Sequence, residues 1–359
     1  MTDSQQAAEN QLRVFFVGGI AMRSTIVDIK NRTGLSLATI SKYLNGGNVR
    51  PENKIKIDEA VKVLHYQVNE NARSLVTNRT RVMGVIVFSV ENHFVGTLLR
   101  YMGQYLREQG YAMMICDSNK SPEAERQNVL SMVQKNVDGI VIMPVSEDQS
   151  VLKPAINAGI PVVCLDRTFD GSDFDSILVS NRETAKKLTE IPINHNHRHI
   201  AVLGSRHEFT GKERLYGFLD AMSEAGLSVP DEYMVVDDYM SIHSGYEGMN
   251  RLISLSCPPT AVFLSNYEIL IGAVMAINTS SFSYPGDFSL VGFDNLLITD
   301  VLRPQITVAI QPLEKLASEA VKLLLKRTDE SKERISSPKE HIVLNTAIRD
   351  YHSVKYLPA

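Results

Sequence analysis

The sequence has few of the features that mark secreted or membrane proteins. It holds only 3 cysteines (Cys116, Cys164 and Cys257), an odd number at wide spacing, each in or beside an apolar run. This usage indicates reduced thiols in a cytosolic protein and not a disulfide framework. The apolar run at residues 14–22 is too short to span a bilayer, and acidic residues precede it where a signal peptide would be basic. We therefore expect a cytoplasmic chain with no membrane partner.

Catalytic motifs are missing as well. The glycines form no phosphate-binding Gly-x-x-x-x-Gly-Lys-Ser/Thr pattern, there is no Gly-x-Ser-x-Gly elbow, and the cysteines have no nucleophile context. His195, His197 and His199 alternate as on one face of a strand, but no nearby Cys or acidic cluster completes a metal-ligand set. No heptad run follows Tyr351, so a coiled-coil tetramerisation tail is not expected. The sequence predicts no enzyme activity, no metal and no cofactor.

Positive charge is concentrated near the N-terminus. The whole chain has a net charge of −4, yet residues 23–81 hold 11 Lys/Arg against 5 Asp/Glu, a net charge of +6. A basic head on an acidic body is typical of a polyanion-binding module joined to a different domain. Residues 1–22 are expected to form a disordered tail, and Met22 would make a natural alternative start.

Residues 23–68 carry the pattern of three short helices. Thr25 is placed to cap the first helix, Gly34 to form a turn, and Ser36 to cap a second helix that buries Ile40. Pro51 suits the first turn of a third helix, which has apolar residues at helical spacing. Two helices joined by a glycine turn predict a helix-turn-helix domain, whose second helix reads bases in the major groove of DNA.

From Val82 onwards, short apolar runs alternate with amphipathic helices, which predicts an α/β body with parallel sheets flanked by helices. The ten expected strands suggest two lobes rather than one sheet. Ligands of such sheets bind beyond the carboxyl ends of the strands, so we expect a binding cleft between the lobes. The strands are expected at residues 82–90, 112–116, 139–145, 162–166, 177–179, 200–204, 234–236, 261–265, 290–293 and 307–310.

The stretch from Thr25 to Asn45, with the Asn-Glu-Asn-Ala-Arg-Ser-Leu sequence at 69–75, resembles the N-terminal signature of LacI/GalR-family transcription regulators. The resemblance implies that residues 69–81 are a hinge helix and linker, and that Leu75 wedges into the minor groove. Lys42 falls where most members have Arg, and Leu37 and Ala38 fall where the family varies residues to choose its operator. The implied DNA-binding residues are Thr25, Ser36, Leu37, Ala38, Thr39, Ser41, Lys42, Asn69, Ala72 and Leu75.

For residues 82–359 the resemblance implies a two-lobed, type I periplasmic-binding-protein-like body for effector binding and dimerisation, in which the chain crosses between lobes near 180, 311 and 342. The N-lobe is expected at about 82–180 and 311–341, and the C-lobe at about 181–310 and 342–359. A ring of carboxylates, guanidinium groups and aromatic rings at the strand ends suits a hydroxyl-rich ligand such as a sugar. The predicted effector residues are Phe94, Asp166, Arg167, Thr210, Arg214, Tyr239, Asn266 and Asp294.

These features predict a transcription regulator, by default a repressor, that binds a near-palindromic double-stranded DNA operator as a homodimer and is controlled by a small molecule in the cleft. One alternative is a regulator of the same fold whose body responds to a corepressor or a protein partner. Another is a solute-binding protein, against which the basic head and hinge argue.

Overall fold

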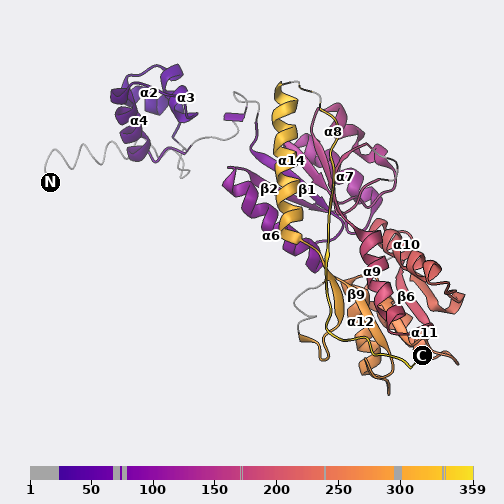
Figure 1. The fold of residues 1–359 in the computed structure, drawn as a ribbon. Helices are drawn as coiled ribbons and strands as arrows, with labels where there is room; N and C mark the ends of the chain where they lie inside the picture. The colour runs from indigo at the N-terminus through magenta and orange to yellow at the C-terminus, as the bar shows by residue number, and fades with distance from the viewer. Residues whose placement is uncertain are drawn as a thin grey trace, which may run out of the picture. The chain divides into compact units, whose positions relative to one another are not determined.

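The computed structural model describes residues 24–67, 73–74, 79–169, 171, 173–237, 240–294, 301–333, 335 and 337–358 (Figure 1). The chain divides into two compact units, Met1–Thr80 and Arg81–Ala359. The first contains the head and the second contains the body, and each is described by itself below.

The head is a bundle of three helices, α2 (Ile26–Thr33), α3 (Leu37–Leu44) and α4 (Pro51–Val63). Its core consists of Ile29, Ile40, Ile57 and Ala60, each no more than 1% exposed. One or two fully buried residues from each helix hold the bundle together, because such short helices are not stable alone in water.

Local capping sets the turn between the first two helices. Gly34 ends α2 with a φ of 70°, a left-handed conformation that glycine adopts without a Cβ penalty. Two residues later the Ser36 hydroxyl accepts a hydrogen bond from the Thr39 N–H at 3.1 Å and so caps α3. The predicted helix-turn-helix is therefore present, with its second helix starting at Leu37.

The body contains two six-stranded sheets, one in each lobe. The N-lobe sheet has the order β11-β5-β4-β3-β1-β2, and all its neighbouring strands are parallel. Its strands are β1 (Val82–Val87), β2 (Ala112–Asp117), β3 (Gly139–Ile142), β4 (Val162–Leu165), β5 (Asp175–Val179) and β11 (His341–Leu344).

The C-lobe sheet has the order β12-β10-β9-β8-β6-β7, and only its edge strand β12 is antiparallel. Its strands are β6 (Ile200–Ser205), β7 (Met234–Asp237), β8 (Ala261–Leu264), β9 (Ser289–Phe293), β10 (Thr307–Ile310) and β12 (Ala347–Arg349). The α/β fold class predicted from the alternating pattern is confirmed.

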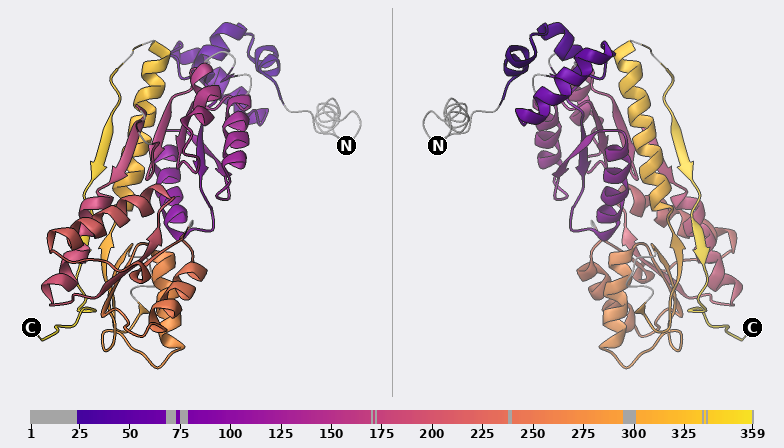
Figure 2. Two further views of the ribbon diagram at one scale, coloured as in Figure 1. Left: turned by 90° about the vertical axis from the view of Figure 1, so that its right-hand side faces the viewer. Right: turned by 90° about the vertical axis from the view of Figure 1, so that its left-hand side faces the viewer.

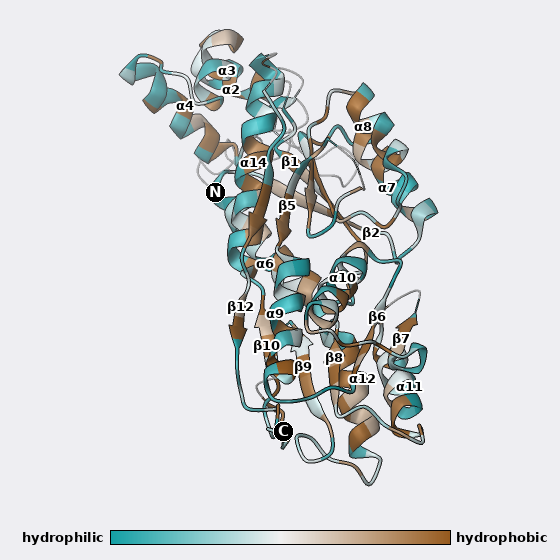
Figure 3. Cartoon of the chain, turned by 45° about the vertical axis from the view of Figure 1, so that its right-hand side comes forward, coloured by the Kyte–Doolittle hydropathy of each residue, from teal (hydrophilic) through white to brown (hydrophobic). Residues whose placement is uncertain are grey.

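Helices cover both faces of each sheet, as the two views in Figure 2 show. The N-lobe core is split between a cluster under α6 and α14 and another under α7 and α8, and the C-lobe core between clusters under α9 and α10 and under α11 and α12. Figure 3 shows apolar strands inside and polar helix faces outside, as burial of the sheets requires. The helices are α6 (His93–Glu108), α7 (Pro122–Gln134), α8 (Lys153–Asn157), α9 (Asn181–Asn194), α10 (Phe209–Glu224), α11 (Ile242–Ile253), α12 (Tyr267–Asn278) and α14 (Leu313–Glu333).

The chain crosses between the lobes three times, between β5 and α9, between β10 and α14, and between β11 and β12. The last crossing lies at residues 345–346, a few residues after the boundary predicted near 342. Ile342 and its neighbours pair in parallel with β5, opposite Ile177, so residues 342–344 belong to the N-lobe. Sequence patterning missed β11 because it is a short edge strand with two of its four side chains exposed.

No helix within the described ranges is both long enough and apolar enough to cross a membrane.

Candidate functional site

The exposed face of α3 carries three of the predicted DNA-binding residues. Leu37 is 41% exposed, and Ala38 and Lys42 are also exposed, whereas Ile40 on the opposite side of the helix is fully buried. All seven basic side chains between residues 24 and 67 are exposed as well. The head therefore presents α3 among exposed basic side chains.

The remaining predicted residues of the head have structural hydrogen bonds. The Thr25 N–H and hydroxyl both donate to Asp28 Oδ2, at 2.7 and 2.8 Å, at the start of α2. Thr39 Oγ1 lies 2.9 Å from the capping hydroxyl of Ser36. Ser41 Oγ accepts a hydrogen bond from the Asn45 side chain at 3.3 Å. The hydroxyls of Thr25, Ser36 and Thr39 are thus held at the N-termini of α2 and α3, a position that suits phosphate oxygens, whereas Ser41 lies in the second half of α3.

A concave surface of about 700 Å³ joins α3 to the start of α4, and sequence reasoning missed half of it. Its lining includes Ala38, Thr39 and Lys42 from α3, and also Asn48, Val49, Arg50 and Asn53. Arg50 immediately precedes α4, where its side chain makes no capping hydrogen bond, and it is exposed. A second cation thus lies on the same surface as Lys42. The one available signal was the unusual Arg at a helix N-cap position.

Gly47 supports the side chain of Lys42. A Cβ on Gly47 would lie 2.6 Å from Lys42 Cγ and 2.9 Å from the Lys42 carbonyl oxygen. The Gly47 N–H also donates to that carbonyl at 2.8 Å. Glycine is therefore required here for the Lys42 stem to lie across the loop that follows α3.

The other three predicted DNA-binding residues, Asn69, Ala72 and Leu75, lie outside the described residues, and so does Tyr239 of the predicted effector set.

The body brings all seven described effector candidates to a single small space between the lobes. Phe94 and the pair Asp166–Arg167 come from the N-lobe, and the other four come from the C-lobe. All are at least nine-tenths buried. We call this space the inner chamber; the other residues around it are Phe88, Asn92, Lys120, Glu208, Met240, Glu268 and Gln311.

Arg214 is the central cation on the C-lobe side of the inner chamber. Its Nε donates to Asn181 Oδ1 at 2.8 Å, and one terminal nitrogen donates to the Ser265 carbonyl at 2.7 Å and lies 3.8 Å from Asp294 Oδ2. The guanidinium also stacks over the Phe293 ring at 3.7 Å. This buried cation is fixed in place on three sides, and its charge faces the chamber.

Arg167 makes the corresponding bridge across the lobes. It donates to Glu208 Oε2 at 2.9 Å, lies 3.4 Å from Asp166 Oδ2, and stacks over Phe88 at 3.9 Å. Glu208 in turn accepts a hydrogen bond from the Met240 N–H at 2.9 Å. The pair Arg167–Glu208 therefore connects the segment after β4 in the N-lobe to the N-cap of α10 in the C-lobe.

Gln311 lies at the second crossing between the lobes and was not predicted from the sequence. Its amide nitrogen donates to Asp294 Oδ1, but its carbonyl oxygen is buried without a hydrogen-bond partner among the described residues. A buried acceptor without a donor costs about 1–3 kcal/mol, so this oxygen is a ready contact for a hydroxyl or N–H group of a ligand. Its position directly after β10 was the signal that could have found it, because the other candidates also follow strands.

Burial shifts the pKa of three ionisable side chains around the inner chamber. Burial raises the pKa of Asp166 despite the opposing effect of Arg167 and Arg214, and it raises the pKa of Glu268 despite Lys120. Burial likewise lowers the pKa of Arg214, against the attraction of Asp294 and Asp166. These charged groups are held away from water, where hydrogen bonds to a ligand are stronger.

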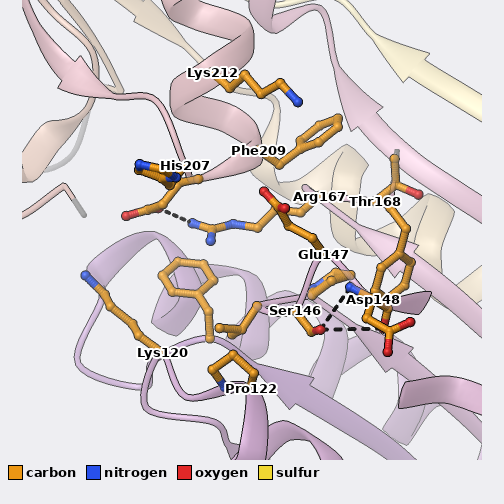
Figure 4. Close-up of a pocket in the computed structure, with 15 residues that line it drawn as sticks. Lys120, Pro122, Ser146, Glu147, Asp148, Arg167, Thr168, His207, Phe209 and Lys212 are labelled. Carbon is orange, nitrogen blue, oxygen red and sulfur yellow. Dashed lines mark hydrogen bonds and ion pairs between the residues drawn. The ribbon is translucent and has the colours of Figure 1, made fainter. Parts of the chain in front are cut away.

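The inner chamber is almost filled by its own side chains, whereas an adjoining space is open. The inner chamber leaves only about 30 Å³, room for a water molecule or two. The adjoining space, which we call the outer chamber, has about 590 Å³. It lies between residues 144–148 and 167–169 of the N-lobe and residues 207–209 and Lys212 of the C-lobe, with Phe88, Lys120 and Pro122 (Figure 4).

Of the three alternating histidines, His197 makes hydrogen bonds that stabilise the fold. His197 is fully buried, with Nδ1 2.8 Å from Thr260 Oγ1 and Nε2 3.0 Å from the Lys355 carbonyl. Burial lowers its pKa. Within the part of the chain that the structure describes, no group of three or more His, Cys, Asp or Glu residues is arranged to hold a metal ion.

Comparison with known proteins gives a consistent result. A family model described as a periplasmic binding protein-like domain matches residues 191–350. The HTH-type transcriptional repressor PurR of Pasteurella multocida is 30% identical over 313 residues, which cover 86% of this chain and 93% of that one. A putative ribose operon repressor from Burkholderia thailandensis has a similar structure, with a TM-score of 0.68 and 27% identity over 76% of this chain and 99% of that one.

The fold of most of this chain is similar to that of a chain in the lac repressor dimer bound to operator and the anti-inducer ONPF. The TM-score is 0.82, with 20% identity, over 93% of this chain and all of the other. At this identity the likeness concerns the fold, and it includes both the head and the body.

Proposed function

The chain belongs to the LacI/GalR family of transcription regulators, and we propose that it represses transcription by binding a near-palindromic DNA operator as a homodimer, under the control of a small molecule held between its lobes. It is a regulator of transcription and not an enzyme. We place its action in the cytoplasm, on double-stranded DNA. A sugar or a sugar derivative is the class of effector whose hydroxyls match the buried polar groups around the inner chamber.

The observation that carries the effector proposal is the set of buried polar groups around the inner chamber. Arg214, Asp294 and Asp166 are each at least nine-tenths buried, and Gln311 adds a carbonyl oxygen that has no hydrogen-bond partner among the described residues. Paired carboxylates and guanidinium groups with aromatic rings beside them bind hydroxyls in pairs and stack on a sugar ring. The relatives named above include the repressor PurR and a putative ribose operon repressor, and we infer the class of effector from the residues of the chamber and not from these relatives.

The ion pair between the lobes provides a physical basis for allosteric control of operator binding. Arg167–Glu208 joins the lobes in the arrangement seen here, and an effector that binds more tightly to one lobe arrangement than to another shifts the population toward it. The hinge segment 69–81 leads directly into β1, so reorientation of the N-lobes in a dimer changes the distance between the two heads. Coupling of this kind is reciprocal: an effector that weakens operator binding itself binds less tightly to the operator-bound dimer.

Thermal unfolding of the full chain with a panel of sugars, sugar phosphates and nucleobases tests the effector proposal. A ligand present at 100 times its dissociation constant is expected to stabilise the native state by ~2.7 kcal/mol and to raise the melting temperature accordingly. The Asp294→Asn variant should lose this shift for the same ligand. If no compound shifts the melting temperature, control by a corepressor or a protein partner replaces the small-molecule proposal.

The salt dependence of an Arg50→Ala variant tests the role of the concave surface and the dimer together. The logarithm of operator affinity falls with the logarithm of salt concentration at a slope of about 0.9 for each phosphate contact. Because a homodimer has two heads, loss of Arg50 is expected to reduce the slope by about 1.8, against about 0.9 for a monomer. Titrations of a selected operator over a range of salt concentrations measure this difference.

Lys62→Ala is the matched control for that titration. Lys62 is equally exposed but lies in the last turn of α4, at the opposite end from Arg50. Its removal changes the net charge by the same amount and is expected to leave the slope unchanged. Equal slopes for all three proteins would mean that Arg50 does not contact phosphate.

A further inference from the structure

The outer chamber is the largest feature of the cleft that the predicted effector residues leave unexplained. Arg167 is the one predicted residue that lines it, and its volume of about 590 Å³ lies within the range of small-molecule sites. The inner chamber, with about 30 Å³, accepts a ligand only if the lobes separate or side chains move. A ligand therefore finds preformed space beside the inner chamber and not within it.

The two chambers meet at the Arg167–Glu208 ion pair. Phe88, Lys120, Arg167 and Glu208 line both chambers. The pair is held by the stack of Arg167 on Phe88 and by the hydrogen bond from Met240 to Glu208. It consequently divides the cleft into two parts and offers donors and acceptors to both.

The lining of the outer chamber combines an apolar surface, large enough to contact one ligand ring, with equal numbers of Lys or Arg and Asp or Glu side chains. Phe209 is half-buried at the start of α10, and Pro122 and Pro144 lie on the N-lobe side. Figure 4 shows Phe209 and Lys212 along α10, with Glu147 and Asp148 nearby from the N-lobe. Three Lys or Arg and three Asp or Glu side chains line the chamber beside His207, so its formal charges balance and favour no charged ligand group. A neutral ring that bears hydroxyls fits this lining best.

The N-lobe wall of the outer chamber is held in place from behind. Glu125 is fully buried and accepts hydrogen bonds from the Val145 N–H at 2.6 Å and the Ser146 N–H at 3.0 Å. Asp148 accepts from the Ser150 N–H at 2.8 Å and caps the short helical turn that follows. A wall fixed by such bonds does not need to become ordered when a ligand binds, which favours affinity.

From these observations we propose that the effector has two linked rings: one bound by the buried charges of the inner chamber, and a second, neutral and hydroxyl-bearing, in the outer chamber. A disaccharide or a glycoside is the matching chemical class. This inference rests on the proposed function, because it extends the effector site between the lobes.

Isothermal titration calorimetry of the full chain tests the inference with matched pairs of sugars: glucose with cellobiose and with maltose, and galactose with lactose and with melibiose. One disaccharide is expected to bind at least tenfold more tightly than its monosaccharide. The Phe209→Ala variant should weaken binding of that disaccharide about tenfold and leave the monosaccharide unchanged. Glu147→Gln, an exposed change of similar shape on the opposite wall, should weaken the disaccharide alone, by severalfold.

Tyr216→Ala is the matched control, because Tyr216 is an exposed aromatic residue on the same helix and lines neither chamber. The Tyr216→Ala variant should bind each sugar with the same affinity as the unmodified chain. A monosaccharide that binds as tightly as every disaccharide, or Phe209→Ala weakening both members of a pair equally, would overturn the two-ring inference and leave the proposed function intact. If a nucleobase or sugar phosphate alone binds, the inference also fails, whereas binding of no small molecule at all overturns the effector proposal itself.

Discussion

Replacement of Arg214 by methionine is expected to lower the free energy of unfolding of the body by about 3–5 kcal/mol. Arg214 is 3% exposed, and its guanidinium faces Asp294 at 3.8 Å and also moderates the charge of Asp166. Methionine fills a similar volume without the charge, so the loss comes from carboxylates left buried beside an apolar side chain and not from a cavity. Urea unfolding of the two proteins measures the difference.

Arg182→Met is the control for this measurement. Arg182 is also ion-paired, with Asp220 at 2.6 Å, but its side chain is 53% exposed. Loss of an exposed pair is expected to cost about 1 kcal/mol or less. The double variant Arg214→Met with Asp294→Asn should recover part of the stability, because it removes one of the stranded charges. Equal destabilisation by Arg214→Met and Arg182→Met would contradict the central role of Arg214.

Operator affinity is expected to fall by about 10³- to 10⁵-fold between roughly 50 and 200 mM salt, if the dimer makes some six to ten phosphate contacts. The sequence from 23 to 81 carries 11 basic residues, and each head presents seven of them, all exposed, between residues 24 and 67. Two heads therefore have enough cations for this number of contacts. Release of counterions from the DNA drives the binding and weakens as salt rises. Fluorescence anisotropy with a selected operator gives the affinity at each concentration.

A duplex of scrambled sequence separates the phosphate contribution from base reading. Its affinity is expected to be lower at every salt concentration, because base contacts are lost. Its salt dependence should remain steep, because the phosphate contacts persist. Operator affinity that stays constant over this range would show that phosphate contacts do not dominate binding by this head.

In the head, sequence predicted most of what the structure contains because the information there is local. A cap at Ser36, a glycine with a positive φ at position 34 and a proline at the start of α4 act within a few residues of themselves. Arg50 was missed as a partner of Lys42 because they share a surface only after α3 and α4 have packed together through Ile40 and Ile57.

In the body, the sequence located the polar residues at the strand ends but did not show which of them contact one another. Parallel strands place their carboxyl ends at one edge, so Asp166 and Asp294 could be assigned to a common site from their positions after apolar runs. Gln311 and Glu208 were not found, because a lone Gln or Glu after a strand or before a helix is ordinary. Their importance comes from neighbours more than 15 residues away in sequence, Asp294 for Gln311 and Arg167 for Glu208.

The sequence by itself determined the helix-turn-helix head, the α/β body and the family, because capping, periodicity and strand-end chemistry are properties of short segments. Only the tertiary structure decided how the cleft is divided. The pairing of Arg167 with Glu208 across the lobes, the nearly filled inner chamber and the open outer chamber all depend on how two separately folded sheets face each other. Contacts between such distant segments are set by packing of the whole body, which no local pattern encodes.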